Sequence, residues 1–198
     1  LPLNFQTYHI HRPKLSVYVP AVEGLANLYV QQHVNQTILN LTQELIHEQG
    51  YPHNPQTESS GYYEIKTNER EVLSLSLINF AYSGGAHGIT YIRSLTFDTS
   101  TGQAYSLADL FKPGADYVGR ISDIVKRQIE ERDIFVLDDE FNGIRPDQDY
   151  YIADKALIIY FQLYELTAYA YGFPYFPISV YDLQDIIKEE GPLGKMIG

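Results

Sequence analysis

The stretch "REVLSLSLINFAYSGGAHGITYIRSLTFD" constrains the fold most, because two long alternating runs flank one cluster of glycines. Apolar and polar side chains alternate over residues 70–83 and again over 89–98, which is the period of a strand that buries one face. Gly84 and Gly85 can adopt positive φ without a Cβ clash, so residues 83–88 predict a tight or bulged turn. The sequence therefore predicts an antiparallel strand pair near the middle of the chain.

Helical periods appear on both sides of this strand pair. One apolar stripe recurs at steps of three or four and is followed by a stop at Gly50 and Pro52; its members are Val22, Ala26, Val30, Val34, Ile38, Leu41 and Leu45. A second amphipathic helix is predicted over residues 116–132, after a short helical turn that a Ser106/Asp109 capping box opens.

Further alternating runs predict the remaining strands. They cover residues 14–20, 62–68, 150–166 and 180–189. Pro20 should end the first run, and the third has a two-residue break at Asp154-Lys155. The fourth is a last strand that leads into a short helix. The tail from Glu190 is expected to be weakly held. This order predicts an α+β fold with a mainly antiparallel sheet and two amphipathic helices packed on it. We expect an N-terminal half, 1–113, and a C-terminal half, 114–198, arranged as two lobes or as one compact domain.

Composition excludes several classes of function. The net charge of -11 would repel a phosphate backbone, so no nucleic-acid partner is expected. Cysteine is absent, which excludes disulfides and thiolate metal sites, and no apolar run approaches the ~18 residues that cross a bilayer. The absence of cysteine and the abundance of tyrosine favour an extracytoplasmic bacterial protein, and we expect any signal peptide or membrane anchor to lie outside this chain.

Histidines are the candidate reactive residues. His87 projects from the glycine turn, but the sequence contains no G-x-S-x-G, H-E-x-x-H or phosphate-loop motif to supply a partner for catalysis. We therefore prefer a structural or binding role, while a small hydrolase centred on His87 stays open as an alternative. His9 and His11 are two residues apart, a spacing that would place both on one side of a strand, but no third ligand is indicated, so we expect a solvated edge and no metal.

Acidic residues gather in a second candidate metal site. Asp138, Asp139 and Glu140, followed by Asp147 and Asp149, lack the glycine-centred spacing of a calcium loop. A solvated charged loop is the preferred interpretation. No catalytic residue, metal or cofactor is predicted.

The segment "GFPYFPI", residues 172–178, is the candidate partner-binding loop. Two prolines limit its flexibility, and rigid exposed aromatics bind partners at low entropic cost. A core-packed corner remains the alternative. Together with the glycine turn, the predicted partner-binding residues are Ser83, Gly84, Gly85, His87, Phe173, Pro174, Tyr175 and Phe176.

Three stretches make the chain resemble a known family: "YSGGAHGITYIRSLTFDTSTGQAYSLADLF", "YYIADKALIIYFQLYELTAYAYGFPYFPIS" and "KLSVYVPAVEG". It resembles the extracytoplasmic sensor domain of RsiV-type anti-sigma factors, which is shared with the non-catalytic module of the peptidoglycan deacetylase PdaC. The resemblance implies an α+β module without chemistry of its own. In RsiV this domain binds lysozyme, which exposes the anti-sigma factor to proteolysis.

Three functional hypotheses follow. The first is a non-enzymatic extracytoplasmic binding or sensing domain whose ligand is a cationic protein such as lysozyme or a cell-wall glycan. The second is the small hydrolase, and the third is a structural or accessory module attached to a cell-wall enzyme.

Overall fold

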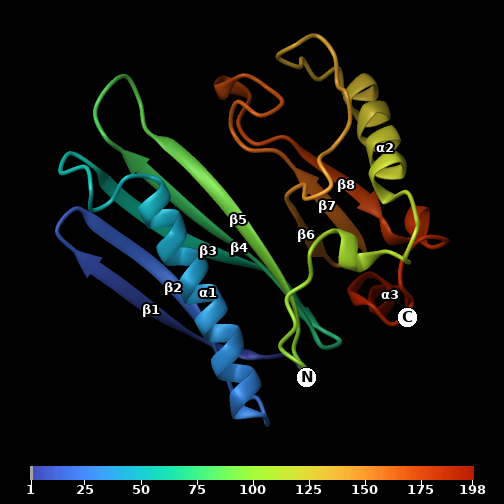
Figure 1. Ribbon diagram of the computed structural model, residues 1–198, viewed down its shortest axis with the longest axis horizontal. Coiled ribbons are helices and arrows are strands. Elements are labelled where there is room, and N and C mark those ends of the chain that lie inside the picture. Colours follow the sequence, from blue (N-terminus) through green and yellow to red (C-terminus); the bar gives the residue numbers. More distant parts are fainter. Residues whose placement is uncertain (1) are drawn as a thin grey trace. The chain divides into compact units, whose positions relative to one another are not determined.

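The computed structural model describes residues 2–198, which divide into two compact units (Figure 1). The first unit ends at Ala104, and the second runs from Tyr105 to Gly198. The short stretch before the predicted division at residue 113 therefore packs with the second unit. The expectation of two domains or one remains a prediction, and each unit is described by itself.

The first unit contains a five-stranded sheet in the order β1-β2-β3-β4-β5. Its elements are β1 (Asn4–Arg12), β2 (Leu15–Glu23), α1 (Leu28–Glu48), β3 (Glu58–Glu69), β4 (Val72–Tyr82) and β5 (Ile89–Asp98). Neighbouring strands are antiparallel except β2 and β3, which run parallel because α1 forms the crossover between them. The expected α+β class with a mainly antiparallel sheet is confirmed.

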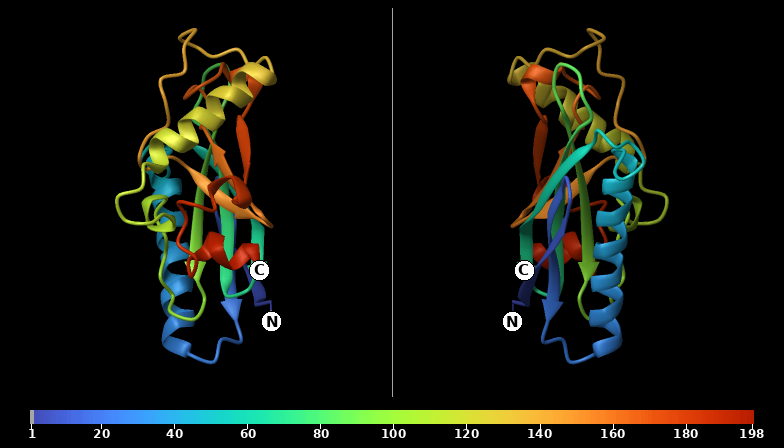
Figure 2. Two further views of the ribbon diagram at one scale, coloured as in Figure 1. Left: turned by 90° about the vertical axis from the view of Figure 1, so that its right-hand side faces the viewer. Right: turned by 90° about the vertical axis from the view of Figure 1, so that its left-hand side faces the viewer.

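The helix α1 covers one face of this sheet, as Figure 2 shows from the side. Asn27 caps its N-terminus, where Asn27 Oδ1 accepts from the backbone N–H groups of Tyr29 and Val30. Val34, Ile38 and Leu45 are buried against the alternate residues of β2 and β4. The predicted apolar stripe is therefore correct from Val30 onward, whereas its first two members precede the helix.

Pro20 does not end β2, contrary to expectation. Two residues further on, Val22 directs its N–H and its carbonyl to the side chain of Asn35 on α1, at 2.7 and 3.0 Å. Backbone groups two residues apart in a strand point to the same side, so the nitrogen of Pro20 also faces away from β1. On that side β3 pairs only as far as Val17, so the ladder needs no N–H from Pro20.

The second unit contains a three-stranded antiparallel sheet in the order β6-β7-β8. Its elements are η1 (Ala108–Leu110), α2 (Tyr117–Glu131), β6 (Tyr150–Ala153), β7 (Ala156–Tyr160), η2 (Tyr169–Tyr171), β8 (Tyr175–Ser179), η3 (Val180–Leu183) and α3 (Pro192–Ile197). The hairpin at Asp154-Lys155 is confirmed, and so is the burial of β7 on both faces, since residues 157–160 are all buried. The capping box is confirmed too, because Ser106 and Asp109 accept reciprocally from each other's backbone N–H.

The C-terminal segment differs from the predictions in two ways. Residues 180–189 form the 3-10 helix η3 and a turn rather than a strand, because Val180, Leu183 and Ile187 are buried at helical spacing. The tail is not weakly held, since Pro192 begins α3 and places Leu193 and Met196 in the interior. A helical period over so few residues is hard to distinguish from irregular chain in the sequence alone.

An ion pair ties this segment to α2. Arg120 donates from both terminal nitrogens to Asp185, at 2.9 and 2.7 Å. This hydrogen bonding lowers the pKa of the Asp185 carboxyl and raises the pKa of the Arg120 guanidinium, because it favours the charged form of each. Within residues 2–198, no helix combines the length and apolar character needed to span a bilayer.

Candidate functional site

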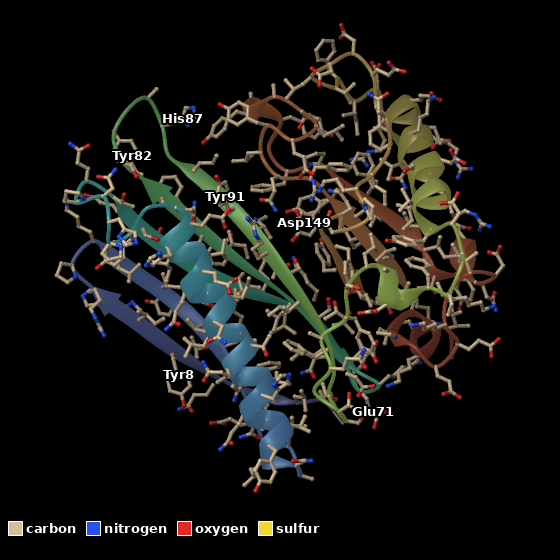
Figure 3. The ribbon with its side chains drawn as sticks, viewed as in Figure 1. Tyr8, Glu71, Tyr82, His87, Tyr91 and Asp149 are labelled. Carbon is tan, nitrogen blue, oxygen red and sulfur yellow. The ribbon has the colours of Figure 1, made fainter. Side chains whose placement is uncertain are left out.

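The glycine turn joins β4 to β5, as predicted. The last cross-strand pair is Ala81 with Ile89, and Gly84 and Gly85 follow with φ of 93° and 96°. Tyr82, labelled in Figure 3, donates from its hydroxyl to the carbonyl of Gly85 at 2.9 Å. The glycine-dependent turn is therefore confirmed, and a side chain of the preceding strand holds it in place.

His87 lies exposed on this turn, at the start of β5 (Figure 3). Its Nδ1 donates to the carbonyl oxygen of Gly88 at 2.8 Å, so one ring nitrogen is engaged with the backbone. This contact orients the ring, and the structural or binding role of His87 stays a prediction. Across residues 2–198 no group of three or more metal-ligating side chains is assembled.

Gly88 and Gly85 are required for different reasons, one steric and one conformational, and substitutions can test this. A Cβ on Gly88 would lie 2.3 Å from Cζ of Phe80 and 2.6 Å from the carbonyl oxygen of Ala81, whereas one on Gly85 would meet nothing within 4 Å. We expect Gly88→Ala to lower the free energy of unfolding by about 1–3 kcal/mol through overpacking. Gly85→Ala should cost about 1–2 kcal/mol through left-handed backbone strain alone.

Substitution by asparagine distinguishes steric overpacking from backbone strain, because asparagine tolerates positive φ better than alanine does. Gly85→Asn should therefore be milder than Gly85→Ala, while Gly88→Asn should be at least as harmful as Gly88→Ala. Urea unfolding measures all four variants. A Gly88→Ala protein as stable as the parent would contradict the steric argument.

His9 and His11 lie on β1, the edge strand of the first sheet. The ring of His9 stacks on Tyr18 with centroids 4.4 Å apart, and its Nε2 lies 2.9 Å from the hydroxyl of Ser16. His11 lies beside it at 5.3 Å. The solvated edge expected for this pair matches the exposure of both residues.

The predicted aromatic loop is wrong in its local structure. Residues Tyr175–Ser179 form β8, whose inward positions are Phe176 and Ile178. Phe176 is 0% exposed and meets the ring of Phe161 edge-to-face, with centroids 5.6 Å apart. Pro174 is buried as well. These two residues form part of the core of the second unit, as the alternative of a core-packed corner predicted, so they are not partner contacts.

This strand was not predicted from the sequence because prolines are rare inside strands. Pro177 lies at an outward position of β8, and β8 is an edge strand that pairs only with β7. A proline is tolerated there because the edge needs no further N–H. The inward alternation of Phe176 and Ile178 was the available signal.

An anchored acidic loop, residues 133–149, presents the largest exposed apolar side chain of the second unit. Ile134 and Val136 point inward and are buried, whereas Phe135 and Leu137 alternate with them and are 76% and 45% exposed. Backbone hydrogen bonds fix this alternation, since Ile134 donates to Ile129 and Leu137 donates to Leu166, both at 3.0 Å. The loop therefore holds two apolar side chains outward.

Acidic side chains follow these two residues directly. Asp138, Asp139 and Glu140 are exposed, and none of them makes an ion pair within the part of the chain that the structure describes. Glu165 lies against the loop but is paired with Arg145. The uncompensated charge therefore gathers beside Phe135 and Leu137. We call these five residues, Phe135, Leu137, Asp138, Asp139 and Glu140, the acidic apolar surface.

The neighbouring segment extends this region with tyrosines. The loop and the segment after β7 enclose a hollow of 260 Å³ whose lining includes Leu137, Phe161 and Glu165. Tyr164, with φ of 65°, is exposed, and its ring lies 5.5 Å from that of Tyr169 in η2. Sequence reasoning placed only a solvated charged loop here, because the alternation of residues 134–137 is too short to distinguish inward from outward positions.

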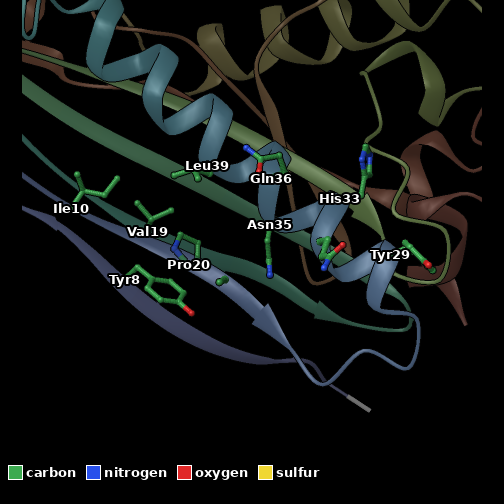
Figure 4. Close-up of a pocket in the computed structure, with 11 residues that line it drawn as sticks. Tyr8, Ile10, Val19, Pro20, Tyr29, His33, Asn35, Gln36 and Leu39 are labelled. Carbon is green, nitrogen blue, oxygen red and sulfur yellow. The ribbon is translucent and has the colours of Figure 1, made fainter.

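The first unit contains an apolar groove of 880 Å³ between α1 and the β1–β2 hairpin (Figure 4). Its walls include Ile10, Val19 and Leu39, with Tyr8 and Tyr29 at the surface. No carboxylate lines it, and the amide of Asn35 is occupied by Val22, so the groove offers no acid and base pair for catalysis. It was missed because the pairing of β1 with β2 was not predicted.

Comparison with known protein families gives one match in each unit. Residues 12–90 match the family model described as deacetylase PdaC. Residues 108–181 match DUF3298, a protein family of unknown function.

Two curated proteins of Bacillus subtilis (strain 168) are similar to the chain. Anti-sigma-V factor RsiV is 29% identical over 191 residues, which cover 89% of this chain and 66% of RsiV. Peptidoglycan-N-acetylmuramic acid deacetylase PdaC is 27% identical over 134 residues, which cover 65% of this chain and 29% of PdaC. The chain thus spans less than two thirds of the length of either relative.

Solved structures share the fold. A member of the DUF3298 family from Bacteroides fragilis NCTC 9343 has a TM-score of 0.72 at 13% identity, covering 98% of this chain and 97% of its own. A DUF3298 family protein from Pseudomonas aeruginosa PAO1 has a TM-score of 0.65 at 15% identity, with 95% and 94% covered. The resemblance to the module of an anti-sigma factor and a cell-wall deacetylase is confirmed.

Proposed function

From the module that this chain shares with RsiV and PdaC, we propose that it is a non-catalytic, extracytoplasmic sensing domain that binds a cationic muramidase of the lysozyme type. The family matches support the coarser part of this statement, a module of sensor or accessory type. The identity of the ligand is the part that experiment must decide.

The acidic apolar surface carries the proposal. Phe135 is held out by a backbone that its buried neighbours fix, so it would lose little freedom when a partner covers it. Interfaces place such an aromatic side chain at the centre and surround it with polar groups that exclude water. Asp138, Asp139 and Glu140 would form that polar surround.

Charge supports a cationic partner. The chain has a net charge of -11, which attracts a basic protein over long range and accelerates encounter. The unpaired acids of the surface would then guide the partner to this place on the chain. Screening by salt should weaken the effect, since the Debye length is about 10 Å at 0.1 M salt.

Surface plasmon resonance against lysozyme tests both the partner and the surface. In a triple variant, Asp138→Asn, Asp139→Asn and Glu140→Gln, we expect association to slow by about tenfold at low salt, with little change in dissociation. A matched control removes three exposed acids of the first unit, Glu23→Gln, Glu44→Gln and Glu69→Gln. Both triple variants change the net charge equally, so only a local contribution distinguishes them.

The outcomes separate the two parts of the proposal. Absence of lysozyme binding by the parent chain would discard the partner. Equal slowing in the two triple variants would keep the partner and discard this surface, because a long-range field alone would then account for the rate. A second candidate function, an accessory module of a cell-wall enzyme, rests on the match of residues 12–90 to the PdaC model.

A further inference from the structure

A small pocket lies at the end of the first sheet, beside the turn between β1 and β2. It measures 310 Å³, and its lining comprises His11, Arg12, Lys14, Leu15, Ser16, Glu58, Ser59, Ser60, Phe80 and Tyr82. These residues come from the ends of four strands that are distant in the sequence. The size is at the lower end of ligand pockets, which span roughly 300–1,000 Å³, so it suits one small ligand group.

The turn that forms one wall is rigidly held. Lys14 has φ of 63°, and its carbonyl accepts from the N–H of Ser59 at 2.8 Å. The carbonyl of Pro13 accepts from the hydroxyl of Tyr51 at 3.1 Å. Lys14 Nζ donates to the carbonyl of Pro55 at 2.8 Å, which leaves two of its three donors for a ligand. A wall fixed in this way lowers the entropic cost of binding.

The wall is basic in a chain that is strongly acidic overall. Arg12 ends β1 and Lys14 lies on the turn, and neither makes an ion pair with any residue from 2 to 198. Arg12 Nη1 donates to the neighbouring carbonyl of His11 at 2.9 Å, so most of the guanidinium donors remain for another acceptor. Glu58 is the one carboxylate in the lining. Two cationic donor groups beside one acid favour an anionic ligand, and a carboxylate matches guanidinium geometry.

The floor of the pocket is aromatic. Phe80 and Tyr82 alternate with Leu73, Leu75 and Leu77, which pack beneath α1, so they project from the opposite face of the sheet. Both rings are exposed. An exposed ring offers a flat apolar surface on which the CH face of a sugar ring can pack. Ser60 offers a hydroxyl to its polar edge, and so does Ser16, whose hydroxyl also contacts His9 Nε2.

From these contacts we propose that the pocket binds a sugar that carries a carboxylate. The apolar face of the sugar ring packs on the aromatic floor, and its polar edge is hydrogen-bonded by the hydroxyl side chains. Arg12 and Lys14 bind the carboxylate. All lining residues belong to the first unit, so this site goes beyond the muramidase surface of the second unit, and failure of one leaves the other standing.

Two amino sugars that differ in one lactyl carboxylate test the proposal. We expect N-acetylmuramic acid to shift backbone amide resonances of Lys14, Ser16 and Ser60 in a nuclear magnetic resonance titration of the full chain. N-acetylglucosamine, which lacks the carboxylate, should bind at least about tenfold more weakly, since a hydrogen bond to a charged group is worth that factor or more.

Variants assign the selectivity to the turn. Arg12→Gln with Lys14→Gln should reduce the affinity for N-acetylmuramic acid to that for N-acetylglucosamine. The control, Lys126→Gln with Arg127→Gln on the exposed face of α2, removes the same charge and should change neither affinity. Phe80→Ala should weaken both sugars equally, and its amide spectrum shows whether the fold is intact.

Three results would overturn the proposal. They are equal binding of the two sugars, resonance shifts confined to residues outside the lining, and retained selectivity in the Arg12 and Lys14 double variant. A triglutamate peptide provides the remaining arm. If it binds this pocket more tightly than N-acetylmuramic acid does, the occupant is an acidic peptide and the sugar assignment is wrong.

Discussion

Replacing Phe176 by alanine is expected to lower the free energy of unfolding of the second unit by about 3–5 kcal/mol. The side chain is 0% exposed, and its ring meets that of Phe161 edge-to-face at 5.6 Å. The guanidinium of Arg132 lies over the same ring, 5.1 Å from its centroid. Truncation would remove these contacts and leave a cavity that the surrounding strands cannot fill.

Urea unfolding of the full chain, followed by circular dichroism, measures this cost. Phe135→Ala is the matched control, because it is the same substitution in the same unit at a side chain that is 76% exposed. It should change stability by no more than about 0.5 kcal/mol. If Phe176→Ala were as mild as Phe135→Ala, Phe176 would be part of a surface, as the partner-binding interpretation of residues 172–178 requires.

The second large effect concerns binding, for which we expect Phe135 to matter and not Phe176. We expect Phe135→Ala to weaken lysozyme binding by about 2 kcal/mol or more, which is about 30-fold. The loss should appear in the dissociation rate, because truncating a central apolar anchor changes the bound complex and leaves the long-range charge intact. This expectation rests on the proposed partner.

Surface plasmon resonance at two salt concentrations separates this effect from that of the acids. The Phe135→Ala defect should persist at high salt, whereas the defect of the Asp138, Asp139 and Glu140 variant should fade. Tyr8→Ala serves as the control, since it removes an exposed aromatic of the first unit. Unchanged dissociation in Phe135→Ala would mean that the partner binds elsewhere.

Local patterns in the sequence were sufficient for much of the fold. The alternation on both sides of "SGGAHG" and the positive φ that Gly84 and Gly85 permit are properties of a few adjacent residues. The same holds for the stripe of α1 from Val30 onward and for the hairpin at Asp154-Lys155. Such features depend on backbone sterics and side-chain period, so no distant residue is needed to predict them.

Other elements depended on partners far along the chain. Pro20 continues its strand only because β3 has already separated from β2, and Asn35 of α1 occupies the backbone groups of Val22. Nothing in residues 14–23 indicates either fact. The strand β1 was likewise missed, because its pairing with β2 decides its conformation.

The same distinction separates the two aromatic segments. Phe135 lies in a short acidic stretch and Phe176 in a proline-rich one, and the sequence left Phe176 open between an exposed loop and a core-packed corner. The structure decides between these alternatives because burial is a property of neighbours. Phe176 is buried by Phe161 and Arg132, whereas Phe135 is held outward by the anchoring of Ile134 and Val136.

The sequence by itself determined the α+β class, the glycine turn and the net charge, because these follow from local period, backbone freedom and composition. Only the tertiary structure decided which side chains form surfaces. The pocket beside Lys14 draws on residues from 11 to 82, and the acidic apolar surface depends on hydrogen bonds that the loop donates to α2 and to Leu166. Contacts across such separations are made when the chain packs, since exposure is set by what covers a side chain and not by its own chemistry.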